Sequence, residues 1–135
     1  MNKPKLAEIE IIAFGYKYGP APQATVVLDL RYLQNPFYQL HLRPLTGLDE
    51  PVQRFIEETN PGARELLEQH LQAMLAGFLK YGNDHHKIVF AFGCTGGKHR
   101  SRFGAFICSE VVKKFAAENG LDCQVSLQFR DDGRE

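Results

Sequence analysis

The sequence lacks an excess of charge of either sign. Its 135 residues contain 16 Lys and Arg against 16 Asp and Glu, which gives a formal net charge of zero at pH 7. A neutral chain has no overall field that would attract nucleic acid or an anionic membrane. Any site for an anion must therefore be local.

Cysteine is also scarce. Cys94, Cys108 and Cys123 are odd in number and form no Cys-x-x-Cys pair, which argues against both a disulfide framework and a structural zinc site. We therefore expect a reducing, cytoplasmic location, and we expect neither a metal nor an organic cofactor.

Long apolar runs and low-complexity tracts are absent too. No stretch is long enough to span a bilayer, and the first residues contain no signal-peptide core, so no membrane partner is expected. Apolar residues make up 44% of the chain, which is typical of a globular protein. At this length we expect one domain over residues 1–135.

Four segments are expected to form strands. Residues 7–14 alternate and are rich in Ile, whereas residues 24–30 are apolar on both faces until Asp29, which predicts a buried central strand. Residues 87–92 form a second buried run, and residues 123–129 alternate again.

Helical signals fill the second half of the chain. Asp49, followed two residues later by Pro, predicts a short helix that runs to Thr59. After a Pro-Gly step a second helix runs to Gly82, and a third covers residues 101–119. The second helix carries an apolar stripe at helical spacing: Leu66, Leu67, Leu71, Met74, Leu75, Phe78 and Leu79.

The order of these elements predicts the fold class. It is strand, strand, helix, helix, strand, helix, strand, which indicates an α/β fold: a single three-layer domain with a small, largely parallel four-stranded sheet flanked by helices. Residues 31–48 are broken by Pro and Gly yet apolar, and we expect them to form an ordered loop over the sheet edge.

The strongest chemical signal is the glycine-rich segment after the strand at residues 87–92. Such a turn before a helix presents several backbone N–H groups at the positive end of the helix dipole, where anions bind. Hydroxyl and cationic side chains add further donors. The predicted phosphate-binding residues are Cys94, Thr95, Gly96, Gly97, Lys98, His99, Arg100 and Ser101.

A simpler interpretation is a tight strand-to-helix turn with its basic side chains in solvent. Three consecutive cationic residues, Lys98, His99 and Arg100, are unfavourable at a helix N-terminus because the dipole there prefers anions. A bound anion removes that conflict. The Walker A pattern does not fit, because Gly93 and Gly97 are separated by three residues in place of four.

The same segment matches the Cys-x5-Arg-Ser spacing of cysteine phosphatases. Cys94 would then be the nucleophile and Arg100 would hold the phosphate oxygens. Such an enzyme also needs an acid for the leaving group, for which Asp131, Asp132 or Asp29 would have to lie near the loop. The alternative for Cys94 is a plain buried thiol, and we do not expect a complete catalytic enzyme.

Four ordered motifs resemble the C-terminal domain of RapZ, the bacterial RNase adapter protein also known from YvcJ-type proteins. They are the segment Gly93–Ser101, Phe14–Gly19 (FGYKYG), Asp29–Pro36 (DLRYLQNP) and Arg43–Asp49 (RPLTGLD). Together they extend over most of residues 12–130.

The resemblance implies a regulatory α/β domain that senses an amino-sugar phosphate, glucosamine 6-phosphate in the best-known members, and that takes part in RNA binding and self-association. It places Cys94, Thr95, Gly96, His99 and Arg100 around the phosphate and sugar. A pocket wall is implied for Gly15, Lys17, Tyr18, Asp29, Arg31, Arg43 and Thr46. From the residues alone, Asp29 with Arg31 is equally a local ion pair.

Two departures from the family limit what the resemblance implies. Full-length RapZ has a P-loop nucleotide-binding domain before this one, which these 135 residues do not contain, so ATP binding is not expected. The tail over residues 129–135 is close to neutral, which weakens contacts with RNA phosphates. A phosphorylated small molecule is therefore the first expected partner; RNA, a regulatory protein and further copies of the chain follow.

Overall fold

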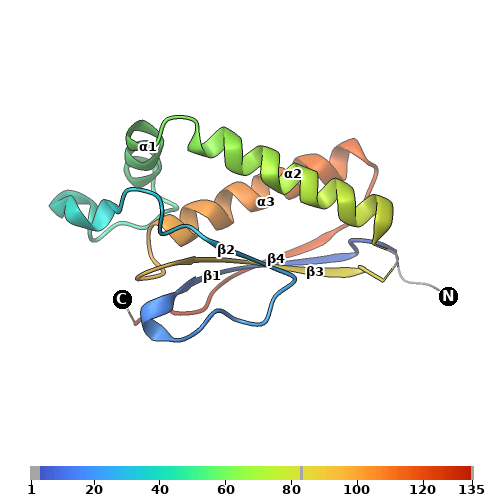
Figure 1. Ribbon diagram of the computed structural model, residues 1–135, viewed down its shortest axis with the longest axis horizontal. Coiled ribbons are helices and arrows are strands. Elements are labelled where there is room, and N and C mark those ends of the chain that lie inside the picture. The colour runs from blue at the N-terminus through green and yellow to red at the C-terminus, as the bar shows by residue number, and fades with distance from the viewer. Residues whose placement is uncertain (1–3, 83, 135) are drawn as a thin grey trace.

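The computed structural model describes residues 4–82 and 84–134, and within them the strands and helices follow one another in the predicted order (Figure 1). Residues 1–3, part of the stretch considered for a signal peptide, and Glu135 of the tail lie outside the described residues. The elements are β1 (Glu8–Gly15), β2 (Val26–Asp29), α1 (Glu50–Thr59), α2 (Ala63–Tyr81), β3 (Lys87–Cys94), α3 (Arg100–Glu118) and β4 (Gln124–Phe129).

The sheet has the strand order β2-β3-β1-β4, and all of its described pairs are parallel. The α/β class and the small parallel four-stranded sheet are thus confirmed. The chain leaves β1 toward one edge of the sheet and leaves β3 toward the other. The carboxyl ends of β1 and β3 therefore form a topological switch point, where open α/β sheets bind their ligands.

The helices and the β1–β2 connection lie on opposite faces of the sheet (Figure 1). Because crossovers between parallel strands are right-handed, a connection that runs in the reverse direction must pass over the other face. That connection packs Tyr16, Ala21 and Ala24 against Ile12 and Phe14 of β1. The predicted three layers are therefore helices, sheet and an irregular segment.

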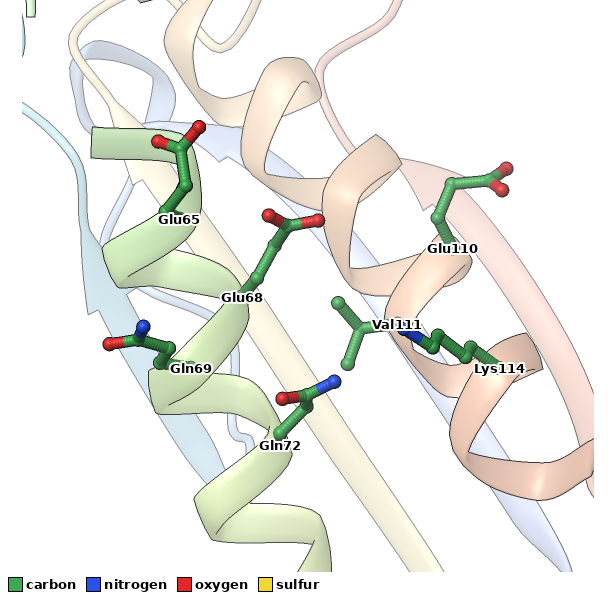
Figure 2. Close-up of a pocket in the computed structure, with 7 residues that line it drawn as sticks. All are labelled: Glu65, Glu68, Gln69, Gln72, Glu110, Val111 and Lys114. Atoms are coloured by element: carbon green, nitrogen blue, oxygen red, sulfur yellow. The ribbon is translucent and has the colours of Figure 1, made fainter. Parts of the chain in front are cut away.

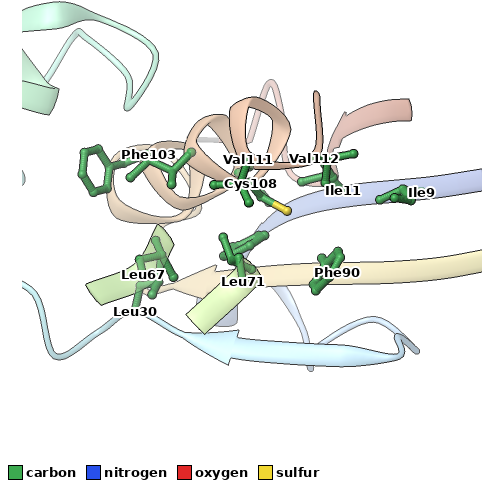
Figure 3. Packing of buried hydrophobic residues seen from close by; sticks show 14 of the residues in the cluster. Ile9, Ile11, Leu30, Leu67, Leu71, Phe90, Phe103, Cys108, Val111 and Val112 are labelled. Carbon is green, nitrogen blue, oxygen red and sulfur yellow. The ribbon is translucent and has the colours of Figure 1, made fainter. Parts of the chain in front are cut away.

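The main core lies between the sheet and α3, with α2 packed on α3 (Figure 3). Ile11 and Phe90 of the sheet and Ile107 of α3 are fully buried. Each such side chain contributes roughly 1.5–3 kcal/mol relative to an exposed one. This packing holds the first turn of α3 rigidly beside the ends of β1 and β3.

Three expectations need correction. β2 is an edge strand and not a central one, since it stands at the end of the strand order. Val26 and Leu28 face the core, whereas Val27 on the other face is 41% exposed. Leu66 is 66% exposed and does not belong to the apolar stripe of α2, since its neighbour Leu67 occupies the core-facing position. β3 continues through Cys94, where parallel pairing with β1 persists.

The segment predicted as an ordered loop contains short 3-10 helices at Pro36–Tyr38 and Leu40–Leu42. Leu33 and Leu42 are buried in the main core and hold the segment beside α3. No described helix is both long and apolar enough to cross a membrane.

Candidate functional site

The loop between β3 and α3 lies at the topological switch point. Cys94 ends β3 opposite Gly15, the last residue of β1, and α3 begins at Arg100. Residues 95–99 therefore connect a central strand to a buried helix start, directly beside the end of β1.

Backbone contact between this loop and the end of β1 requires glycine. A Cβ atom on Gly15 would lie 2.6 Å from the carbonyl carbon of Gly96. A Cβ atom on Gly97 would lie 2.6 Å from the Gly15 nitrogen, and Gly97 has a φ of 73°, which other residues rarely adopt. The two chain segments thus pack main chain against main chain.

Carbonyl groups of the loop are bound by donors outside it: Thr95 by Lys17 N (3.1 Å), Gly97 by Arg102 Nε (3.2 Å) and Lys98 by Gly47 N (2.9 Å). In a trans peptide the C=O and the following N–H point in opposite directions. The N–H groups of the next residues, Gly96, Lys98 and His99, therefore point away from those donors. Among the described residues, these three amides and that of Arg100 have no hydrogen-bond acceptor.

Cys94 is part of the frame of the loop. Its Sγ accepts hydrogen bonds from the N–H groups of Gly97 (3.3 Å) and Ser101 (3.4 Å) and lies 3.3 Å from Ser101 Oγ. The residue is 2% exposed. These contacts tie the last residue of β3 to the first turn of α3.

The Nε–Nη2 edge of the Arg100 guanidinium has no strong hydrogen-bond acceptor among the described residues. Its Nη1 donates to the carbonyls of Arg31 (3.0 Å) and Leu33 (3.1 Å), whereas Nη2 reaches Thr95 Oγ1 only at 3.5 Å. Nε is buried and has no hydrogen-bond partner among the described residues. The Nε and Nη2 groups together form the edge that binds two oxygens of a carboxylate or phosphate.

His99 and Lys98 bind the 3-10 segment. His99 Nε2 donates to the carbonyl of Leu42 at 3.0 Å, and burial lowers the pKa of the imidazole, which favours the neutral form. Lys98 Nζ donates to the Arg43 carbonyl at 2.7 Å. Both contacts hold the loop at a fixed distance from the segment that contains the 3-10 helices.

A pocket of about 330 Å³ lies between the loop and the segment that contains the 3-10 helices. It brings together nine of the predicted residues: Lys17, Tyr18, Arg43, Cys94, Thr95, Gly96, Lys98, His99 and Arg100. Its described lining contains cations but no carboxylate. An anion is thus the ligand charge that this pocket favours.

Other predicted residues support the pocket from outside its lining. Gly15, Gly97 and Ser101 make the backbone contacts given above. Thr46 accepts the Leu48 N–H on its Oγ1 at 3.1 Å and so shapes the turn beside Gly47.

Asp29 and Arg31 form an ion pair next to the pocket, with 2.6 Å between Oδ2 and Nη2. The hydrogen bond from Arg31 lowers the pKa of the Asp29 carboxyl, and the charge of Arg100 acts in the same direction. The Arg31 guanidinium also lies 4.0 Å from the centre of the Tyr16 ring.

Asn35, Phe37 and Tyr38 also line the pocket and were absent from the predicted site. Asn35 Oδ1 accepts the Phe37 N–H at 3.1 Å and starts the 3-10 turn. The Arg43 guanidinium stacks on Phe37 at 4.3 Å. The signal for them in the sequence is an Asn-Pro turn followed by two aromatic residues.

The C-terminal tail holds the end of β1. The Asp131 carboxylate is 3% exposed and accepts the Gly15 N–H at 2.7 Å, while Arg130 Nη2 donates to the Gly15 carbonyl at 3.1 Å. Asp29, Asp131 and Asp132, the acids considered for a phosphatase, do not line the pocket.

A second hollow of about 400 Å³ lies between α2 and α3 (Figure 2). Polar side chains of both helices border it: Glu65, Glu68, Gln69, Gln72, Glu110 and Lys114, with Val111 at its floor. Over the described part of the chain, no three His, Cys, Asp or Glu side chains lie close enough to hold a metal ion together.

Comparison with known proteins adds to this geometry. The family model described as RapZ C-terminal domain matches residues 7–132. The chain belongs to this family. The resemblance of the four motifs is thereby confirmed, and the motifs meet around one pocket of this RapZ C-terminal domain.

Relatives of this RapZ C-terminal domain are named nucleotide-binding proteins. One from Leifsonia xyli is 40% identical over 129 residues, which cover 95% of this chain and 42% of that protein. One from Lactobacillus acidophilus is 45% identical over 114 residues, covering 82% of this chain and 38% of that protein. The chain therefore spans about two-fifths of the length of these relatives.

Proposed function

We propose that this domain binds the phosphate group of a small molecule at the β3–α3 loop and acts as a regulatory binding module, not as a complete enzyme. The observation that carries the proposal is Arg100, which lines the pocket and whose buried Nε has no hydrogen-bond partner among the described residues. A buried unpaired donor costs roughly 1–3 kcal/mol, and a ligand oxygen would remove that cost.

The free amides supply the rest of the anion site. Those of Gly96, Lys98, His99 and Arg100 lack acceptors among the described residues and stand at the start of α3. Oriented N–H groups and the helix dipole stabilise a phosphate at such a position. Cations on the pocket lining, Lys17 and Arg43 included, add to the attraction.

An amino-sugar phosphate, glucosamine 6-phosphate first, is the ligand we propose within this class. Phe37 and Tyr38 offer aromatic surface to a sugar ring on the wall opposite the loop. The Asp29 carboxylate lies outside the pocket lining, but its charge interacts with Arg100, and it would reach the ligand ammonium only after its pair with Arg31 opens. The family resemblance favours the same ligand.

Calorimetric titration with glucosamine 6-phosphate, glucose 6-phosphate, inorganic phosphate and sulfate tests this proposal. We expect binding of all four, tightest for the amino sugar, with the preference over glucose 6-phosphate lost in Asp29→Asn. Equal affinities would leave only an anion site. Absence of heat and of thermal stabilisation with every compound would overturn the proposal.

Nucleotides and RNA are further phosphate-containing candidates. The relatives carry the name nucleotide-binding, but they are much longer than this chain, so we rank mononucleotides below sugar phosphates. RNA ranks lower as well, because the tail cation Arg130 is bound to Gly15 and Asp131. Titration with adenosine monophosphate and with a structured RNA at two salt concentrations measures both, and light scattering measures self-association.

A cysteine phosphatase is the alternative function. The two amides that donate to Cys94 Sγ are the type of contact that stabilises a thiolate nucleophile. Against it stand the burial of Cys94 and the absence of a carboxylate from the described pocket lining. Release of phenolate from an aryl phosphate by the protein, and its loss in Cys94→Ser, would establish the enzyme and refute the pure binding module.

A further inference from the structure

We infer that Arg102 is a positioning residue, which turns the Lys98 N–H toward the pocket and so completes the anion site without touching the ligand. The inference rests on the proposed function, since it concerns how the same loop binds phosphate. Arg102 was not among the residues predicted from the sequence, and it does not line the pocket.

The position of Arg102 is fixed from several sides. It lies in the first turn of α3 and is 5% exposed. Its guanidinium stacks on the ring of Phe129 at 4.5 Å, and Nη2 lies 3.4 Å from Asp132 Oδ1. A buried, stacked guanidinium has few alternative conformations, so its Nε direction is set by the core and the tail.

The Arg102 Nε donates to the Gly97 carbonyl at 3.2 Å. That carbonyl belongs to the Gly97–Lys98 peptide, whose N–H must therefore point the opposite way. Gly97 has a left-handed φ, and glycine at such a position rotates easily between peptide orientations. Without a donor on its carbonyl, this peptide would be the least constrained of the loop.

The neighbouring amides depend on other donors. Lys17 N holds the Thr95 carbonyl and thus the Gly96 N–H, while Gly47 N holds the Lys98 carbonyl and thus the His99 N–H. A change at Arg102 should therefore alter one amide selectively. This selectivity separates a positioning role from a general loss of structure.

The test uses Arg102→Lys, Arg102→Met and the control Lys114→Met. Lys114 lies at the far groove between α2 and α3, so its variant loses the same charge away from the site (Figure 2). Inorganic phosphate is titrated into each 15N-labelled protein while the amide signals are followed. Thermal unfolding without phosphate reports stability.

In the wild type, phosphate should shift the amide signals of Gly96, Lys98 and His99. In Arg102→Lys, which keeps the charge but not the Nε geometry, we expect the Lys98 shift to disappear and the other two to remain. Phosphate affinity should fall about tenfold, as for loss of one hydrogen bond to a charged group. Lys114→Met should bind as the wild type does.

Two results would overturn the inference. The first is that phosphate still shifts the Lys98 amide signal in Arg102→Lys as it does in the wild type. The second is that only Arg102→Met loses phosphate affinity and that this loss disappears at high salt, which would show a plain charge effect. A wild type whose amides do not respond to phosphate would instead refute the proposed function. If Arg102→Met does not fold, Arg102→Lys decides alone.

Discussion

The β3–α3 pocket and the α2–α3 groove are both hollows bounded by α3, yet their polar groups are held in opposite ways. In the pocket, His99 and Arg100 are each 5% exposed and bind main-chain carbonyls at 3.0–3.1 Å. At the groove, the bordering side chain Glu68 pairs with Arg64, which lies outside the lining, at 3.9 Å, and both side chains are about a third exposed. Within the described residues, the donors of the pocket are thus more buried and more closely held than the side chains of this pair.

The two hollows differ in the charge of the side chains that line them, although the whole chain has zero net charge. Cations gather at the start of α3, where the dipole would oppose them, whereas the groove is bordered by Glu65 and Glu68 of α2 and by Glu110 and Lys114 of α3. Fixed, buried groups act through a low dielectric, whereas exposed groups are screened by solvent.

The largest effect is expected from Gly15→Ala. A Cβ atom there would lie 2.6 Å from the Gly96 carbonyl carbon, so main chain has to move. Overpacking of this kind costs roughly 1–3 kcal/mol, and displacement of the loop amides should abolish phosphate binding. Urea unfolding and calorimetry measure the two effects.

Gly77→Ala is the matched control. It lies within α2, where an added Cβ would meet nothing within 4 Å. Alanine in a helix interior is favoured over glycine by roughly 0.5–1 kcal/mol, so this variant should be stabilised and should bind phosphate normally. If Gly15→Ala still binds phosphate, the contact between the end of β1 and the β3–α3 loop does not shape the site.

Arg100→Lys ranks next. Lysine keeps the charge but cannot hold the Arg31 and Leu33 carbonyls while presenting a flat Nε–Nη2 edge. Phosphate affinity should fall at least tenfold, or about 1.4 kcal/mol. Arg54→Lys, on the exposed face of α1, is the control. Similar phosphate affinities for the wild type, Arg100→Lys and Arg54→Lys would mean that charge alone, and not the Nε–Nη2 edge of Arg100, attracts the anion.

How much of the fold the sequence predicts depends on burial. The strand at β1 and the stripe of Leu67, Leu71 and Leu75 were identified because apolar periodicity follows directly from packing on one face. β2 was misplaced because a short apolar run looks the same in a central strand as in an edge strand whose outer face is left open.

The candidate site divides in the same way. The loop after β3 could be predicted because its amides and cations are contiguous in sequence. Asn35 and the tail residue Asp131 reach the site from distant segments, and their roles depend on tertiary contacts that no local pattern encodes. Asp131 was considered as an acid, whereas the structure uses its carboxylate to hold the Gly15 N–H.

Stability should depend on pH through His99. Burial lowers the pKa of His99 in the folded state, so between that value and about 6.5, the ordinary histidine pKa, the unfolded chain binds more protons. The stabilising contribution is therefore complete above about 6.5 and is lost as pH falls through the folded pKa. Urea midpoints at pH 7.5 and 5.5 without ligand should show the decrease.

His99→Gln should reduce this pH dependence, since glutamine does not titrate and retains a donor for the Leu42 carbonyl. His70→Gln, at an exposed position of α2, provides the comparison and should leave the wild-type dependence intact. If both variants lose the same small part of it, His99 is not the residue responsible.

The smallest effect is expected in the α2–α3 groove. Glu68→Gln combined with Glu110→Gln removes two negative charges from a surface where solvent screens them. Phosphate affinity at physiological salt should change by less than about twofold, because surface charges beyond a Debye length of about 8 Å act weakly. A large gain in affinity would mean that the carboxylates of the groove weaken phosphate binding in the pocket through the electrostatic field. The phosphate affinity would then depend on the groove as much as on the loop, and the anion site would not be local.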